Sequence, residues 1–194
     1  MAIAPRQRAI GKSSRRTERP LSRAVEVVRT YLELRTPRQL LPARTEDPTV
    51  RFVHRPAIAT SDYRRLYRDV GARWHWHDRD AWSDEKLSAY LARPNVRVWE
   101  CLVGNESAGY FELVRSDDGS VEIAYFGLTI GFTGRGIGKA MLTRAAEEAW
   151  ALDASRVWLH TCTLDSPGAL PNYRARGFQE FRQERYLATL PDEH

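Results

Sequence analysis

The sequence of 194 residues is 42% hydrophobic and 10% aromatic, which is enough for one domain with a substantial core. Its formal net charge is +5, and residues 1–20 account for all of it, with six Arg or Lys against one Glu. We predict that residues 1–20 form a disordered basic tail. Because the rest of the chain sums to zero charge, the folded part does not favour nucleic acid as a partner.

Other sequence features indicate the compartment. No run of about 18 apolar residues is present, so we expect no transmembrane helix and no membrane partner. The basic N-terminus lacks the apolar core of a secretory signal. Cys101 and Cys162 both fall in predicted strands and are expected to be free thiols in a reducing compartment. These features together predict a cytoplasmic protein.

Residues 21–48 are predicted to form an N-terminal helical arm. Val25, Val28 and Leu32 recur at helical spacing, which predicts an amphipathic helix over residues 22–34. Two prolines follow and end the pattern. The helix could pack on the main domain or on a partner subunit, which leaves a homodimer open.

Residues 49–194 are predicted to form the main domain. Its first strand covers residues 50–54, where apolar and polar residues alternate. Ser61 and Asp62 can cap a helix that runs to about residue 70, and Ser83 can cap a second helix that ends before Pro94.

The loop between these two helices is unusually aromatic, because residues 73–80 read RWHWHDRD. His75 and His77 would share a face in an extended segment, which raises the question of a metal site. No further His, Cys or carboxylate shows ligand spacing apart from Asp78 and Asp80 nearby, so we predict no metal.

The remaining segments alternate between strands and helices. Hairpins join the early strands, whereas a helix separates the strands at 121–130 and 156–162 and makes them parallel. The fold class is therefore α/β, with a mixed sheet flanked by helices. The predicted strands are 96–103, 108–115, 121–130, 156–162 and 178–187, and the predicted helices are 137–150 and 167–176.

A glycine-rich turn separates the strand at 121–130 from the helix at 137–150. It reads GFTGRGIGK over residues 131–139. Glycines let backbone N–H groups approach a ligand, the helix dipole adds partial positive charge, and Arg135 and Lys139 add full charges. The turn therefore predicts a phosphate or pyrophosphate ligand. It lacks the third glycine of the dinucleotide fingerprint, and Ala140 stands where a nucleotide-hydrolase loop needs Ser or Thr.

This turn resembles the first signature of the GNAT superfamily of acyl-CoA N-acyltransferases, [Q/R]-x-x-G-x-[G/A]. Gly136, Ile137 and Gly138 match its glycine part, and Thr133 stands at the Q/R position. In the family, most contacts from this loop to the coenzyme come from backbone N–H groups.

A second stretch resembles the later GNAT signature, N-x-x-A-x-x-x-Y-x-x-x-G-F. Ala169, Tyr173, Gly177 and Phe178 match it, and Ser166 stands at the Asn position. The similarity covers roughly residues 50–187. It implies a GNAT-like fold, in which two parallel strands splay apart around the coenzyme, and it implies acetyl-CoA as co-substrate.

The resemblance also implies which residues hold acetyl-CoA. Backbone groups at the end of the central strand would bind the pantetheine arm, and the glycine loop would bind the pyrophosphate. The implied residues are Leu128, Thr129, Ile130, Thr133, Gly134, Arg135, Gly136, Ile137, Gly138, Lys139 and Ser166.

Acetyl transfer to an amine needs a base for the amine, a donor for the oxyanion and a proton for the departing thiolate. By resemblance, Glu122 is the candidate base, Tyr173 the candidate acid, and the N–H of Leu128 the donor to the acetyl carbonyl. Glu112 is a lesser candidate to orient the amine, and His160 could carry a proton.

The resemblance also implies where the acceptor binds. In the GNAT layout, the segment that joins the first two helices borders the acceptor site. The aromatic loop favours an aromatic or cationic acceptor. The candidate substrate residues are Tyr67, Trp74, Trp76 and Tyr125.

The sequence thus predicts an enzyme that moves an acetyl group from acetyl-CoA to a primary amine of a small molecule by direct attack. A non-catalytic acyl-CoA-binding regulatory module on the same fold remains an alternative. A protein N-acetyltransferase is a further alternative. GNAT proteins are often dimers, which is consistent with a homodimer here.

Overall fold

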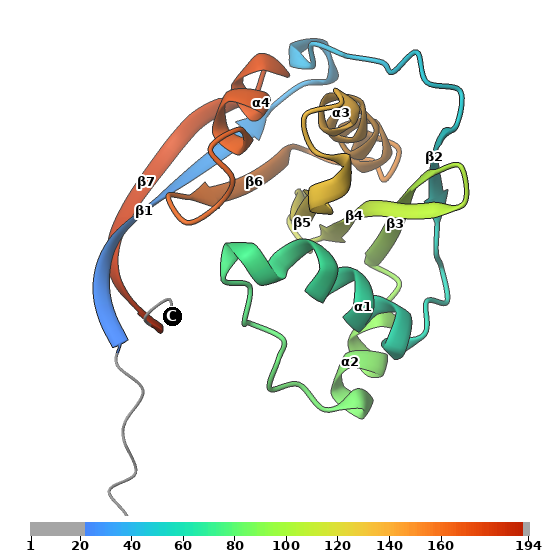
Figure 1. The fold of residues 1–194 in the computed structure, drawn as a ribbon. Helices are drawn as coiled ribbons and strands as arrows, with labels where there is room; N and C mark the ends of the chain where they lie inside the picture. The colour runs from blue at the N-terminus through green and yellow to red at the C-terminus, as the bar shows by residue number, and fades with distance from the viewer. Residues whose placement is uncertain (1–21, 192–194) are drawn as a thin grey trace, which may run out of the picture. The chain divides into compact units, whose positions relative to one another are not determined.

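The computed structural model describes residues 22–191. It contains strands, α-helices and short 3-10 turns in a mixed order (Figure 1). The strands are β1 (Ser22–Leu34), β2 (Val50–His54), β3 (Val96–Val103), β4 (Glu106–Arg115), β5 (Val121–Leu128), β6 (Val157–Cys162) and β7 (Gln179–Pro191). The α-helices are α1 (Thr60–Gly71), α2 (Asp84–Leu91), α3 (Ile137–Trp150) and α4 (Ala169–Ala175).

The chain divides into two compact units. One unit is residues 27–186 and holds all four helices. The other unit contributes, within the described residues, only the outer ends of β1 and β7. The functional features below all lie in the unit of residues 27–186.

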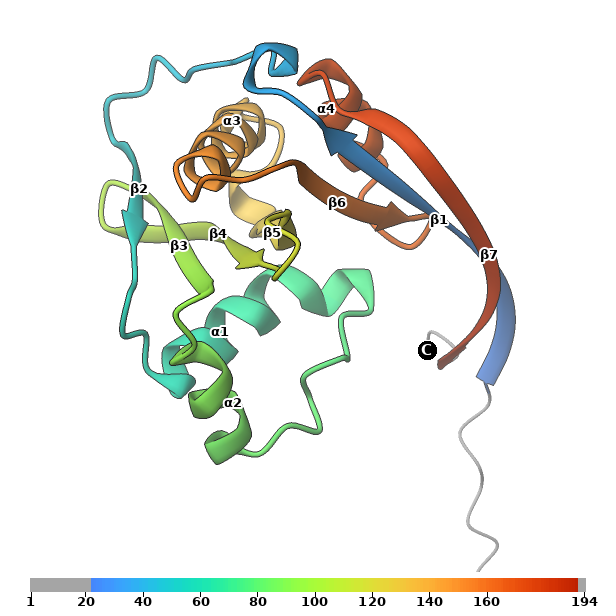
Figure 2. The same cartoon turned by 180° about the vertical axis from the view of Figure 1, so that it is seen from behind.

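Seven strands form one mixed sheet in the order β2-β3-β4-β5-β6-β1-β7. Neighbours β2 to β5 are antiparallel, β5 and β6 are parallel, and β6 and β1 are antiparallel. This matches the predicted α/β fold class. Figures 1 and 2 show α3 on one face of the central strands and α1 and α2 on the other.

Each face of the sheet has its own apolar core, because successive strand residues point to opposite faces. Phe111 and Leu113 of β4 pack with Met141 and other residues of α3. Tyr110, next along β4, packs with Tyr63 of α1 and Leu87 of α2. The segment 106–115 is therefore buried on both sides, which places it at the centre of the fold.

Strand β5 has two irregularities. Only Val121 and Glu122 pair with β6, so the two parallel strands separate beyond that point. On the other edge, Glu112 opposes Tyr125 and Leu113 opposes Ile123, which leaves Ala124 as an extra residue in a β-bulge. The splay that the GNAT resemblance implied is therefore present.

The predicted helix at residues 22–34 is wrong, since this segment is strand β1 within the sheet rather than a helical arm. Thr30, Leu32 and Leu34 are buried at strand spacing, and Leu32 pairs with Leu159 of β6. Its many β-branched residues favour a strand, and the helical spacing of Val25, Val28 and Leu32 was coincidental. The tail predicted for residues 1–20 lies outside the described residues.

Candidate active site

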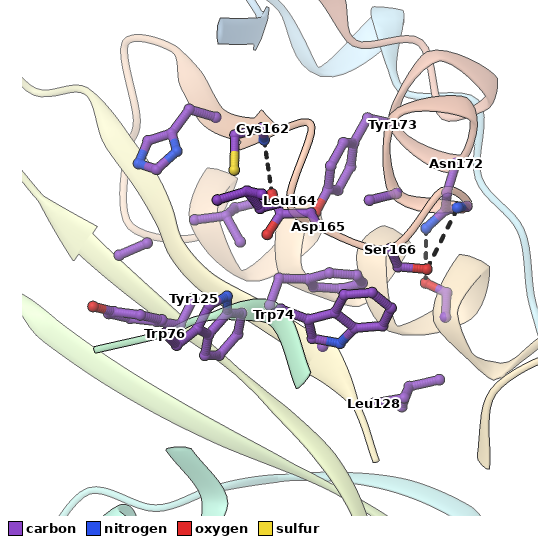
Figure 3. Close-up of a pocket in the computed structure, with 18 of the residues that line it drawn as sticks. Trp74, Trp76, Tyr125, Leu128, Cys162, Leu164, Asp165, Ser166, Asn172 and Tyr173 are labelled. Carbon is purple, nitrogen blue, oxygen red and sulfur yellow. Dashed lines mark hydrogen bonds between the residues drawn. The ribbon is translucent and has the colours of Figure 1, made fainter. Parts of the chain in front are cut away.

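The splay between β5 and β6 opens into a cavity of ≈ 690 Å³. Figure 3 shows Trp74, Trp76, Tyr125 and Leu128 along one side, and Leu164, Ser166 and Tyr173 among the side chains opposite. One end of the cavity reaches the glycine turn, and the other reaches the aromatic loop between α1 and α2. A single space therefore connects the predicted coenzyme and acceptor residues.

The glycine turn has the geometry of an anion cradle. Gly134 and Gly136 have φ angles of +75° and +76°, which favour glycine, and Gly136 begins α3 with no side chain capping its N–H groups. A Cβ added at Gly134 would meet nothing within 4 Å, so the backbone there faces open space. Uncapped N–H groups at a helix start fit the pyrophosphate of acetyl-CoA.

Of the two charged residues of the turn, one lines the cavity and the other does not. Lys139 is exposed and lines the cavity. Arg135 instead places its guanidinium 5.2 Å from the centre of the Phe132 ring and does not line the cavity. Thr133, at the Q/R position of the signature, lines the cavity while its hydroxyl donates to the Ile130 carbonyl at 2.9 Å.

The end of β5 presents one backbone donor to the cavity. Thr129 donates its N–H to the Ala108 carbonyl of β4 at 2.9 Å, so that group is already used. Successive N–H groups of a strand point to opposite edges, so the Leu128 N–H points away from β4 towards the splay. Thr129, Ile130 and Ile137 do not line the cavity, and Ile137 is buried in the α3 core.

The second signature closes the cavity from α4. Ser166 lines it, and its Oγ accepts a hydrogen bond from the Gly168 N–H at 3.4 Å. Asn172 donates from Nδ2 to the Gly138 carbonyl at 3.4 Å, which joins α4 to the first turn of α3. Sequence reasoning missed Asn172, although it lies next to Tyr173 of the signature.

Tyr173 is 6% exposed and lines the cavity from α4. Its ring packs edge-on against Phe126 of β5, with centroids 6.1 Å apart, so the side chain bridges the splay. Burial raises the pKa of the Tyr173 phenol, and the Asp165 carboxylate adds to the shift. Tyr173 therefore stays protonated at neutral pH and can donate a proton or a hydrogen bond.

Glu122 lies on β5 at the last residue paired with β6, and it lines the cavity. Burial raises the pKa of Glu122 to about 7, with a further increase from Glu112 and a decrease from Arg79. His160 of β6 places Nε2 3.9 Å from Glu122 Oε1. Burial and Arg29 lower the pKa of His160, so its imidazole is neutral near pH 7. A neutral His beside a carboxylate with a pKa near 7 can exchange protons.

A buried arginine, Arg79, anchors the aromatic loop. Its guanidinium binds both oxygens of Glu112 at 2.8 Å, and both side chains are at most 7% exposed. Tyr63 of α1 and Tyr90 of α2 donate to the same carboxylate. Glu112 is thus saturated and does not line the cavity, so it is not placed to orient an amine directly. Sequence reasoning missed Arg79 because an arginine in a polar loop usually faces solvent.

Three of the four predicted substrate residues come together. Trp74, Trp76 and Tyr125 line the cavity, and the Trp76 and Tyr125 rings meet edge to face with centroids 5.1 Å apart. Trp76 packs so closely on Gly71 that a Cβ there would overlap its indole. Tyr67 is 5% exposed and lines a neighbouring cavity of ≈ 280 Å³ rather than this one.

Within residues 22–191, no three His, Cys, Asp or Glu side chains converge as metal ligands. In the same residues, no helix is both long and apolar enough to cross a membrane. Both cysteines are free thiols, and Cys162 lines the cavity next to Asp165, which accepts from its backbone N–H at 2.8 Å.

A splayed mixed sheet with an uncapped helix start beside the splay is suited to a ligand rich in phosphate. The sequence profile of the acetyltransferase (GNAT) family matches residues 62–178, which is more than half of the chain. The chain therefore belongs to the GNAT acetyltransferase family, for which acetyl-CoA is the expected co-substrate. No curated protein matches it in sequence.

Solved structures share the fold at low identity. A GCN5-related N-acetyltransferase from Kribbella flavida is 18% identical with a TM-score of 0.59, over 86% of this chain and 59% of its own. An aminoglycoside acetyltransferase from an uncultured soil metagenomic sample is 18% identical with a TM-score of 0.57. The match covers 68% of this chain and 90% of that protein. An IAA acetyltransferase from Bacillus cereus is 21% identical with a TM-score of 0.53. The match covers 69% of this chain and 79% of that protein. The chain spans less than two thirds of the Kribbella protein.

Proposed function

We propose that this protein transfers the acetyl group of acetyl-CoA to a primary amine of a small molecule by direct attack. The observation that carries the proposal is the single cavity that contains both the glycine cradle and Glu122. The cradle can hold the pyrophosphate, and Glu122 can serve as a base near neutral pH because its pKa is about 7.

The residues would divide the chemistry as follows. Acetyl-CoA supplies the acetyl group as a thioester. The amine nitrogen forms a bond to the acetyl carbon while the carbon–sulfur bond breaks. Glu122 takes the proton that leaves the amine, and Tyr173 gives a proton to the sulfur. The Leu128 N–H, which points towards the splay, stabilises negative charge on the acetyl oxygen.

Small-molecule acceptors are supported by the size and form of the acceptor end. Trp74, Trp76 and Tyr125 line it, and α1, α2 and the loop between them cover that side of the sheet. The aminoglycoside and IAA acetyltransferases named above share this fold and act on small molecules by their names. A concave site lined by large aromatic side chains favours a compact amine over a side chain on a protein surface.

Thermal unfolding with and without acetyl-CoA tests the first half of the proposal. At about 100 times its dissociation constant, acetyl-CoA should add about 2.7 kcal/mol to the unfolding free energy, which raises Tm by about 5–10 °C. We expect Gly138→Leu to lose this shift, because Gly138 lines the cavity and a Cβ there lies 3.7 Å from Leu128.

Gly131→Leu is the matched control, since a Cβ at Gly131 meets nothing within 4 Å and the residue does not line the cavity. It should keep the shift. An equal shift in both variants would contradict the cradle assignment. A shift in the wild type with no release of coenzyme A thiol over a broad amine panel would favour the non-catalytic module instead.

A further inference from the structure

The acceptor half of the cavity contains carboxylates without basic partners. Asp78, Glu122 and Asp165 line the cavity, and among residues 22–191 no Lys or Arg nitrogen lies within 4.0 Å of any of them. The neutral His160 places Nε2 3.9 Å from the Glu122 carboxylate. Asp165 is held by the Thr161 hydroxyl at 2.7 Å and by the Cys162 N–H. Negative charge is thus concentrated on this surface.

The cations near these carboxylates do little to neutralise them. Arg79 is committed to Glu112 through two hydrogen bonds, so that pair carries no net charge. Arg29 lies over the Tyr186 ring, 5.1 Å from its centre, and faces the cavity from β1. Lys139 belongs to the cradle at the other end. Asp78, Asp165 and the partly ionised Glu122 outnumber the single remaining arginine on this part of the cavity lining, which makes it acidic.

Asp78 stands beside aromatic surface. Its Oδ2 accepts a hydrogen bond from the Tyr125 hydroxyl at 3.2 Å, and the Tyr125 ring meets Trp76. Asp78 lines the same cavity as the Glu122–His160 pair. A carboxylate next to aromatic rings is a favourable site for an organic ammonium group.

We propose that the acceptor carries a second cationic group, which binds at Asp78 beside Trp76 and Tyr125 while Glu122 receives the proton of the reacting amine. The acceptor class is therefore a small diamine or oligoamine. This inference rests on the proposed acetyltransferase function and specifies its substrate. A simple monoamine would leave the Asp78 carboxylate without its counter-ion.

The test compares linear diaminoalkanes with monoaminoalkanes of the same chain length, at saturating acetyl-CoA, by the release of coenzyme A thiol. In the wild type, we expect kcat/KM for the best diamine to exceed that of its monoamine at least tenfold, equivalent to about 1.4 kcal/mol. Asp78→Asn should abolish most of this preference through a higher KM for the diamine. It should leave acetyl-CoA binding unchanged, because Asp78 lies away from the glycine cradle, and added salt should weaken the wild-type preference.

Asp80→Asn is the matched control. Asp80 is exposed like Asp78 and lies two residues away, but it hydrogen-bonds His77 Nδ1 at 2.8 Å and does not line this cavity. It should keep the diamine preference. Equal use of diamines and monoamines by the wild type would overturn the second-cation inference and leave the acetyltransferase proposal intact. Acetylation of no amine at all would overturn the acetyltransferase proposal and this inference with it.

Discussion

The two ends of the cavity are built in different ways. The cradle end consists of backbone groups from one continuous stretch, in which Gly134 and Gly136 adopt positive φ angles and α3 begins uncapped. The acceptor end is lined by side chains from the loop after α1, from α2 and from β5, and Arg79 connects them to Tyr63 of α1 and Glu112 of β4. A local backbone site can be encoded in a short motif, whereas a site of converging side chains depends on the whole fold.

The largest loss of stability should come from replacing Arg79, which connects the side chains around the acceptor end. Arg79→Met would remove both hydrogen bonds that Arg79 gives Glu112 and leave a fully buried carboxylate with only two tyrosine donors. Loss of one partner of a buried ion pair costs about 3–5 kcal/mol, and we expect a decrease of this size in the unfolding free energy measured with urea.

Arg135→Met is the matched change at the cradle end. Arg135 is exposed and lies over the Phe132 ring, so the unfolding free energy should change by less than about 0.5 kcal/mol. Equal losses of stability in the two variants would contradict the contrast between a side-chain site and a backbone site.

Tyr173→Phe should affect catalysis but not stability, because it removes only the phenolic oxygen. Tyr173 lies between the cradle end and the acceptor end of the cavity. The ring contacts with Phe126 and Phe178 would remain, so stability should be retained. If Tyr173 protonates the sulfur, kcat should fall about 100-fold or more while the affinity for acetyl-CoA stays constant. An unchanged kcat would assign Tyr173 to packing alone.

The same contrast explains what the sequence predicted. The glycine turn, helix α3 and the strands on either side were predicted within a few residues, because their signals are local. The Ser83 cap was also confirmed, since its Oγ accepts the Lys86 N–H at 3.2 Å. These features depend on neighbouring residues and need no knowledge of the fold.

The failures involve partners that are distant in sequence. Strand β1 pairs with β6, more than a hundred residues away, so its identity depends on a surface that sequence patterns do not describe. Arg79 is buried only because Glu112, Tyr63 and Tyr90 surround it from three elements. The position of Tyr67 behind Trp76 follows in the same way from how α1 docks on the sheet.

The central claim is that Glu122 is the base for the amine, and its pH dependence tests this most directly. We would measure kcat/KM for the amine from pH 5 to 9 in the wild type and in Glu122→Gln, and divide one profile by the other to cancel the ionisation of the amine. Since burial raises the pKa of Glu122 to about 7, the carboxylate gains basicity as pH rises through 7.

The wild-type to variant ratio should therefore rise through an apparent pKa near 7 and level off at about 100 or more, the usual contribution of a general base. Acetyl-CoA should stabilise both proteins equally, which would show that the cradle end is intact in the variant. A ratio that stays near one across the whole pH range would contradict the account, because the amine would then lose its proton without Glu122.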